Sequence, residues 1–245
     1  MNKVQPRFLI FDFFGTLVDY IPNREAVEFQ QAKAFLNHLD IDANVVWPIL
    51  ESEFIAFENQ SKSTLIEFSL TQLMSSFFDK LKQPTDNAEK IRLSNAQINQ
   101  FIDVYLDDWN KGVNYLPKLS DCLSALAESF HLAIITNTHH PSLVPNHLQA
   151  MGVIDYFQSI FTSVEIGYAK PSNMIFEFAL HQLNAKAAES IYIGDHYQAD
   201  YLGAINAGMN AILVDPNHQY ATEVNMENRI DSVLTLPERF HRTGF

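Results

Sequence analysis

Asp12 is the first residue of this sequence whose type and position point to chemistry. It follows the apolar run Phe8–Phe11, which predicts a short buried strand, and it comes just before a Gly15-Thr16 turn. Packing explains an acidic side chain at this place poorly, because acidic groups are rarely buried without a partner. In open α/β sheets, ligands bind beyond the carboxyl ends of the strands. Asp12 is therefore a candidate reactive group at a sheet edge.

Two further segments place polar side chains near predicted strand ends. Thr136 and Asn137 follow the apolar run Leu132–Ile135, where a hydroxyl and an amide can hydrogen-bond anionic oxygens, although both residue types also form ordinary turns. Lys170 stands directly before Pro171, between two predicted strands. Most lysines are solvated surface residues, but this position before a proline and between two strands makes Lys170 a candidate site residue. These residues are candidates for binding an anionic group.

The strongest pattern is the carboxylate pair Asp195 and Asp200, which straddles the segment after the apolar run Ile191–Ile193. Hard cations such as Mg²⁺ prefer oxygen ligands and keep several of their waters. A helix N-terminus, where the dipole favours an acidic residue, would account for Asp200 but not for Asp195. The pair therefore indicates a magnesium site.

Short strands alternating with helices are expected to position these groups. The strand candidates are Phe8–Phe11, Leu132–Ile135, Ile191–Ile193 and Ala211–Val214, with a weaker one at Ser159–Phe161. Apolar residues at helical spacing lie between them: Leu119, Leu123 and Leu126 in one stripe, and Ile175, Phe178, Ala179 and Leu183 in another. This alternation predicts a doubly wound, Rossmann-like α/β fold with a parallel sheet and right-handed crossovers.

Residues 20–115 interrupt the alternation. The stretch holds no convincing strand and reads as successive amphipathic helices, with capping boxes expected at Thr64–Glu67 and Ser94–Gln97 and a linker at Lys82–Asp86. An insert of about 95 residues is too long for a plain crossover. We therefore expect a helical domain over 20–115, inserted into a core made of 1–19 and 116–245.

The segment Asp12-Phe13-Phe14-Gly15-Thr16-Leu17 resembles the first motif of the haloacid dehalogenase (HAD) superfamily, normally Asp-x-Asp-Gly-Thr. Thr136, Lys170 and the Asp195–Asp200 pair follow in the order and approximate spacing of the other three motifs of that superfamily. The resemblance covers the core on both sides of the insert. It implies a Rossmann-like core and a helical cap of the C1 type that closes over Asp12.

The resemblance also implies roles for the matching residues. Asp12 would attack phosphorus and form an aspartyl-phosphate, which splits one difficult displacement into two easier ones. The implied Mg²⁺ ligands are Asp12, Asp195 and the backbone carbonyl of Phe14, with Asp200 supporting the site. The implied groups for the transferring oxygens are Thr136 and Lys170, with Gly15, Thr16 and Asn137 as substrate-binding residues.

Phe14 is the one departure from the motif. In phosphatases of the superfamily, the residue at this position protonates the leaving group and then helps to activate water, and Phe can do neither. Losing such assistance costs about 10² to 10⁴ in rate. We therefore expect a preference for good leaving groups, such as acyl or aryl phosphates, unless His139, His140 or His196 replaces the missing acid.

An aromatic residue at this position also resembles the L-2-haloacid dehalogenases, which have Tyr there and displace halide without a metal. Those enzymes hold the substrate carboxylate with an Arg early in the cap, whereas Arg24 and Arg92 of this insert stand in other contexts. Phe176 stands where they have Tyr, and Asp195 belongs to a motif that in them reads Ser-Asn. A dehalogenase acting through an ester at Asp12 is thus the alternative. A non-catalytic or regulatory binding protein with this fold is another alternative.

The composition limits the partners. A formal net charge of −13 argues against nucleic acid, since phosphate-backbone binding needs clustered Lys and Arg. The single cysteine, Cys122, excludes an internal disulfide and a cysteine-rich zinc site.

No apolar run approaches the length of a membrane span, and the first run is too short for a signal peptide. We expect a cytoplasmic monomer or homodimer that acts on a small phosphorylated molecule.

Overall fold

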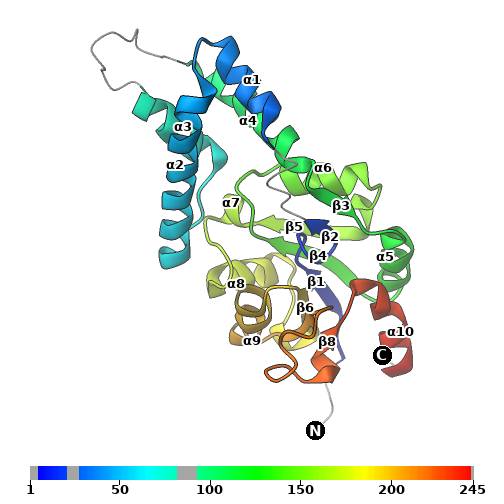
Figure 1. Ribbon diagram of the computed structural model, residues 1–245. Helices are drawn as coiled ribbons and strands as arrows, with labels where there is room; N and C mark the ends of the chain where they lie inside the picture. The colour runs from blue at the N-terminus through cyan, green and yellow to red at the C-terminus, as the bar shows by residue number, and fades with distance from the viewer. Residues whose placement is uncertain (1–4, 21–27, 82–92, 244–245) are drawn as a thin grey trace. The chain divides into compact units, whose positions relative to one another are not determined.

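The computed structural model describes residues 5–20, 28–81 and 93–243 (Figure 1). The chain divides into two compact units, one formed by residues 1–20 with 114–245 and the other by residues 21–113. No helix among the described residues is long and apolar enough to cross a membrane. The first unit is called the core unit below, and the second the helical unit.

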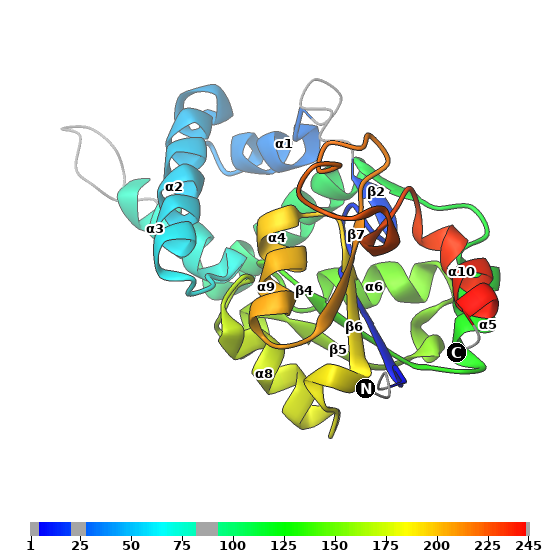
Figure 2. The ribbon, with the colours of Figure 1, turned by 90° about the horizontal axis from the view of Figure 1, so that it is seen from below.

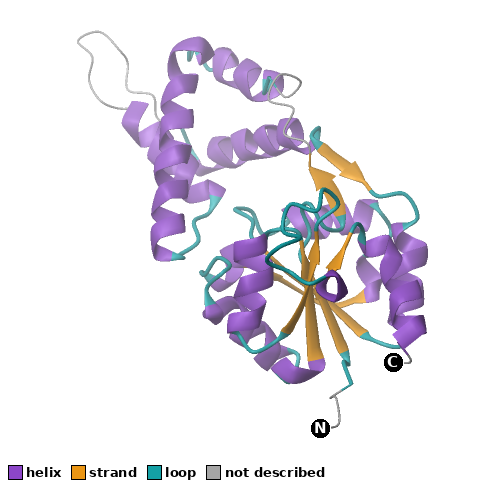
Figure 3. Cartoon of the chain, turned by 60° about the horizontal axis from the view of Figure 1, so that its bottom comes forward, coloured by secondary structure: helices purple, strands orange, loops and turns teal. Residues whose placement is uncertain are grey.

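A parallel six-stranded sheet forms the centre of the core unit (Figure 3). Its strands are β1 (Phe8–Phe11), β4 (His131–Thr136), β5 (Phe157–Thr162), β6 (Ser190–Gly194), β7 (Asn210–Val214) and β8 (Arg229–Ile230). They lie side by side in the order β5-β4-β1-β6-β7-β8, and every pair is parallel. The predicted strands are confirmed, including the weaker candidate inside β5. The two-residue β8 is too short to leave a pattern.

Helices cover both faces of this sheet, so the doubly wound α/β prediction is confirmed (Figure 2). One face carries α8 (Asn173–Gln182) and α9 (Gly203–Asn206), and the other carries α5 (Leu119–Ala127), α6 (Leu143–Ala150) and α10 (Leu236–Thr243). The short α7 (Ser163–Ile166) follows β5 directly. Burial on both faces explains why β1 is apolar at every position rather than at alternate ones.

The packing of α8 corrects one part of the expected stripe. Ile175 and Ala179 are fully buried against residues of the sheet, whereas Phe178 remains 43% exposed. At 100° per residue, Phe178 lies far round the helix from the centre of the buried face that Phe176 and Leu180 help to form. Its ring instead meets Phe161 edge-on.

The helical unit has a hydrophobic core of its own. It contains α1 (Gln30–His38), α2 (Ala43–Thr64), α3 (Leu70–Leu81) and α4 (Asn95–Asn110). Fully buried aromatic rings fill its centre: Phe77, Phe78 and Phe101. Because burying such rings stabilises a fold strongly, this insert can fold around its own interior.

Only one of the two expected capping boxes is present. Ser94 and Gln97 bond reciprocally at the start of α4, as predicted. Thr64, by contrast, is the last residue of α2, and its hydroxyl donates to the Gln60 carbonyl. Ser69 and Gln72 exchange the corresponding bonds at the start of α3. The prediction placed the box five residues too early, and the linker Lys82–Asp86 lies outside the described residues.

The chain enters and leaves the insert through a small two-stranded sheet of β2 (Val18–Tyr20) and β3 (Val113–Tyr115). The expectation of no strand between residues 20 and 115 is therefore wrong at both ends. Each of these strands has three residues, which is too short for an alternating pattern to show. They pair across almost a hundred intervening residues.

Candidate functional site

The register of the sheet brings three of the predicted site residues together. β1 lies between β4 and β6, with Phe11 paired to Ile134 on one side and to Ile193 on the other. Asp12 continues this ladder, because its N–H donates to the Ile193 carbonyl at 2.8 Å. Thr136 and Asp195 each follow two residues after those partners of Phe11. The carboxyl ends of three neighbouring strands therefore present a carboxylate, a hydroxyl and a second carboxylate at one edge.

Asp12, Asp195 and Asp200 form a cluster in which one oxygen of each lies within 4.8 Å of the others. Lys170 is the cation of the group, with Nζ 2.8 Å from Asp12 Oδ1 and 2.6 Å from Asp200 Oδ1. Its side chain is only 3% exposed. Three carboxylates and one ammonium leave two negative charges uncompensated when all are ionised. The cluster thus has the charge and the oxygen ligands that suit a divalent cation.

The ionisation of these groups follows from their burial. Burial raises the pKa of Asp12; the neighbouring Lys170 opposes this effect and Asp200 adds to it. Burial also raises the pKa of Asp195, to about 7, with repulsion from Asp12 and Asp200 contributing. Burial alone would lower the pKa of Lys170, but the two facing carboxylates outweigh it and raise that pKa. Lys170 therefore stays charged.

The turn after Asp12 fits closely against Asp195. Gly15 has φ +79°, and a Cβ at that position would collide with the Asp195 carboxylate. The Thr16 hydroxyl donates to Asp195 Oδ1 at 3.4 Å. The N–H of Gly15 donates to Val18 and that of Thr16 to Phe13. These two residues, predicted to bind substrate, here hold the turn and Asp195.

Protein groups donate hydrogen bonds to both carboxylate oxygens of Asp200. It lies in a π-helical turn, η3 (Tyr197–Leu202), a rare form that is frequent at functional sites. Its Oδ2 accepts the His196 N–H at 2.8 Å, and its Oδ1 accepts Lys170. A Cβ on Gly194 would lie 2.5 Å from Asp200 Cγ, so only glycine permits this approach. Both carboxylate oxygens of Asp200, which could otherwise bind a metal, therefore accept hydrogen bonds that hold Lys170 and the loop after Asp195 in place.

Two buried atoms of this site form no well-directed hydrogen bond, Asp12 Oδ1 and Thr136 Oγ1, although the Thr136 hydroxyl also interacts with the Asp12 carboxylate. Lys170 forms an ion pair with the first of them without the angle of a hydrogen bond. Asn137, in contrast, is fully engaged, since it accepts the Lys170 N–H at 2.8 Å and donates to the Lys170 carbonyl at 3.2 Å. A cation or a ligand oxygen can therefore bind at the Asp12 and Thr136 side chains, while Asn137 fixes the backbone of Lys170.

Phe14 belongs to a cluster of aromatic rings. Its ring lies 4.8 Å from that of Phe13 and 6.3 Å from those of Tyr20 and His147, each in an edge-on arrangement. Tyr115 and His147 share a hydrogen bond of 2.9 Å between Oη and Nδ1. Position 14 thus offers a packed hydrocarbon ring where the resembled motif has an acid.

The histidines considered as substitute acids have other partners. His196 is exposed, and its Nδ1 accepts the Ala199 N–H at the start of η3. His140 Nδ1 lies 3.1 Å from the Ser142 hydroxyl. Neither His139 nor His140 is without a partner. The arginines considered for a substrate carboxylate, Arg24 and Arg92, lie outside the described residues.

The sequence patterns missed Tyr192. This residue lies in β6 and is fully buried, and its hydroxyl contacts Lys170, Asp200 and the Ile135 carbonyl. Burial, followed by the nearby Asp200 carboxylate, raises the pKa of Tyr192 well above its usual value, so the phenol keeps its proton. One signal was available, because a buried tyrosine inside an apolar strand usually has a partner for its hydroxyl.

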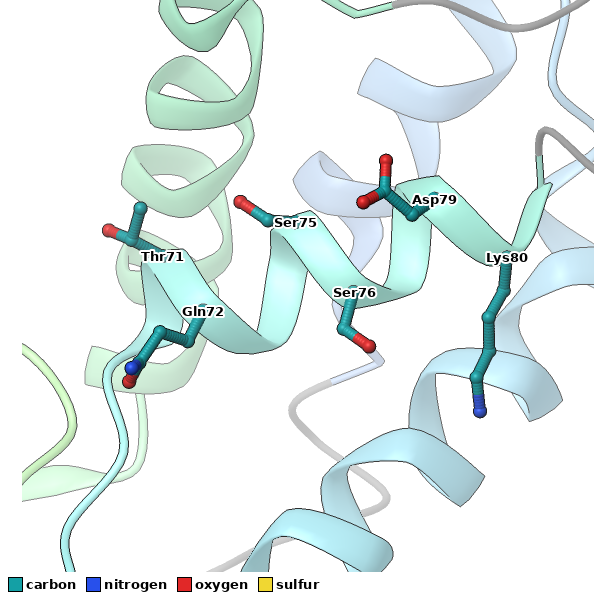
Figure 4. A pocket seen from close by; sticks show the side chains of 6 residues that line it. All are labelled: Thr71, Gln72, Ser75, Ser76, Asp79 and Lys80. Atoms are coloured by element: carbon teal, nitrogen blue, oxygen red, sulfur yellow. The ribbon is translucent and has the colours of Figure 1, made fainter.

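A surface hollow in the helical unit does not contribute to this cluster. Six side chains of a single helix, α3, line it (Figure 4): Thr71, Gln72, Ser75, Ser76, Asp79 and Lys80. None of them is a predicted site residue.

Comparison with known proteins places the chain among relatives of known chemistry. Residues 9–214 match the family model described as haloacid dehalogenase-like hydrolase. The chain is 27% identical to a ribulose-1,5-bisphosphate 5-phosphatase of Halopiger xanaduensis over 56% of its own length and 61% of the relative's. It is 25% identical to a phosphoglycolate phosphatase of Colwellia psychrerythraea, covering 92% and 91% of the two chains. The chain spans 61% of the length of the first of these relatives, and 42% and 57% of the lengths of two further curated relatives.

Solved structures share the fold. A 2-haloacid dehalogenase of Pseudomonas syringae aligns with a TM-score of 0.72 and 22% identity, covering 98% of this chain and 100% of the other. A HAD phosphatase of Thermococcus onnurineus aligns with a TM-score of 0.66 and 18% identity over 96% and 97% of the two chains. At these identities the likeness concerns the fold alone, which both phosphatases and dehalogenases have.

Proposed function

Because this chain belongs to the haloacid dehalogenase-like hydrolases, we propose that it is a Mg²⁺-dependent phosphatase of a small phosphorylated molecule. The observation that carries the proposal is the buried cluster of Asp12, Asp195 and Asp200 around Lys170, which has two negative charges in excess when all four groups are ionised. A site that displaces halide without a metal has no need of such an excess. The phosphatase names of the relatives support the same choice.

In the proposed reaction, an Asp12 oxygen forms a bond to phosphorus as the bond from phosphorus to the leaving oxygen breaks. Water then attacks the aspartyl-phosphate and releases phosphate, restoring Asp12. Lys170 fixes the orientation of Asp12, and the buried Thr136 hydroxyl beside Asp12 can donate to a phosphoryl oxygen. Asp12, Asp195 and the Phe14 carbonyl would hold Mg²⁺, which when bound neutralises the charge that separates carboxylate from phosphate.

The contacts of Asp200 refine its proposed role. Both of its oxygens already accept hydrogen bonds, from His196 and Lys170. Asp200 therefore supports the metal site by fixing Lys170 and the loop that follows Asp195. The roles of Asn137 and Thr16 are likewise assigned to support, through Lys170 and Asp195 respectively.

Phe14 narrows the proposed substrates. The ring packs among other aromatic rings and carries no proton for a leaving group. A leaving group that departs as a stable anion, such as a carboxylate or a phenolate, does not need that proton. Acyl and aryl phosphates are therefore the proposed substrate class. The cytoplasmic location, the role of residues 20–115 as a C1-type cap and the monomeric or homodimeric state remain parts of the same proposal.

The aromatic residue at position 14 favours one second candidate, a dehalogenase acting through an ester at Asp12. The experiment that separates the candidates is a panel of acyl phosphates, aryl phosphates, alkyl phosphates and 2-haloacids, assayed with Mg²⁺ and with a chelator. We expect phosphate release that needs Mg²⁺ and disappears in Asp12→Asn. Halide release in chelator would overturn the proposal in favour of the dehalogenase. Inactivity on every compound would favour the non-catalytic binding protein.

A further inference from the structure

The hydroxyl of Tyr192 lies where three strand ends of the core meet. It accepts a hydrogen bond from Lys170 Nζ at 2.8 Å and lies 3.3 Å from Asp200 Oδ1. It also donates to the carbonyl of Ile135, next to Thr136, at 2.7 Å. The side chain is fully buried in β6, and its ring meets that of Phe176 edge-on at 5.3 Å. The phenol therefore has a fixed place.

Counting protons shows how the hydroxyl is used. A phenol has one proton to donate and lone pairs with which to accept. The Ile135 carbonyl, at 2.7 Å, is the nearer acceptor and takes the proton, which leaves a lone pair directed at Lys170. An ammonium has three protons. Two of them bind Tyr192 and Asp200, which leaves the third for Asp12, whose Oδ1 lies 2.8 Å from Nζ.

We propose that Tyr192 is a positioning residue for phosphoryl transfer, whose hydroxyl fixes the Lys170 ammonium against Asp12 and ties it to the strand end that carries Thr136. Without the hydroxyl, the Lys170 ammonium can turn its third proton away from Asp12, and the Ile135 carbonyl loses the hydrogen bond that Tyr192 donates. The turned ammonium no longer fixes the orientation of the Asp12 carboxylate. The lost hydrogen bond at Ile135 loosens the backbone beside Thr136. The kinetic part of this inference rests on the proposed function.

The test is Tyr192→Phe, which removes one oxygen atom and keeps the ring against Phe176. We expect kcat for an acyl phosphate to fall about 10- to 100-fold, the range for losing one hydrogen bond to a charged group. The KM and the Mg²⁺ concentration for half activation should stay within about twofold, since neither substrate nor metal is held by the phenol. Tyr156→Phe is the matched control, because its hydroxyl only meets Ser120 at an exposed site, and it should keep the kcat of the parent. An unchanged kcat in Tyr192→Phe would overturn the inference.

A second measurement does not depend on the reaction. Urea unfolding of Tyr192→Phe, Lys170→Met and the double variant forms a thermodynamic cycle. If the two side chains interact, the double variant loses clearly less free energy of unfolding than the two single variants lose together. Additive losses would overturn the proposed contact even if every substrate fails. Coupling in a protein that hydrolyses nothing would leave the contact supported and reject the proposed function alone.

Discussion

Replacing Lys170 by Met tests the charge arrangement at the centre of the site. The ammonium lies 2.8 Å from Asp12 Oδ1 and 2.6 Å from Asp200 Oδ1, and its side chain is 3% exposed. Its removal leaves two buried carboxylates without a cation. Breaking a buried ion pair in this way costs about 3 to 5 kcal/mol. We expect the free energy of unfolding of the metal-free protein to fall by that amount.

The assay is equilibrium urea unfolding followed by circular dichroism, with tryptophan fluorescence recorded in parallel. Both tryptophans, Trp47 and Trp109, lie in the helical unit and report on that unit alone. With a urea m-value of about 1 to 3 kcal/mol/M, the transition of the core unit should move down by at least about 1 M. Lys186→Met is the control, because Lys186 is 80% exposed in its pair with Glu189 and should cost at most about 1 kcal/mol. A Lys170→Met protein as stable as this control would show that Lys170 does not neutralise the buried carboxylates.

Three further predictions concern the acid, the turn and the metal. Phe14→Asp should raise turnover of alkyl phosphates by about 10² to 10⁴ and change that of acyl phosphates little; equal gains on both would contradict the proposed lack of a proton donor. Gly15→Ala should weaken Mg²⁺ binding measured by calorimetry, because its Cβ collides with Asp195, whereas Gly152→Ala, also at positive φ but with open space around it, should not. Since burial raises the pKa of Asp195 to about 7, a proton must leave before Mg²⁺ binds, and the affinity should fall about tenfold per pH unit below 7. An affinity that is flat from pH 5 to 8 would contradict the proposed release of a proton from Asp195 when Mg²⁺ binds.

The parts of the fold that repeat a pattern were predictable from the sequence. Strands buried on both faces, such as Phe8–Phe11, stand out as apolar runs, and the register of parallel strands then brings their ends to one edge. The strands β2 and β3 were not predictable, because each has three residues and its partner lies far along the chain. The capping box at Thr64 was predicted wrongly because a Thr three residues before a Glu matches the sequence pattern even when the Thr still belongs to the preceding helix.

The candidate site shows a similar limit. Residue type and motif position identified Asp12, Lys170 and Asp195, which the fold brings together. They did not show that Asn137 holds the backbone of Lys170, because that depends on the path of two loops. They also did not identify Tyr192, because its hydroxyl bonds to Lys170 and Ile135, which are close to it only in the folded chain.

In the proposed reaction, Asp12 becomes phosphorylated during turnover. Because Phe14 cannot activate the attacking water, the second step should be slow and the phosphorylated form should accumulate. Acid quenching of the protein during turnover of an acyl phosphate with Mg²⁺, followed by peptide mass spectrometry, measures this directly. We expect one phosphoryl group on the peptide that contains Asp12, less of it in Phe14→Asp, and none in Asp12→Asn. Sustained phosphate release with an unmodified Asp12 in the quenched wild-type protein would contradict the proposed reaction.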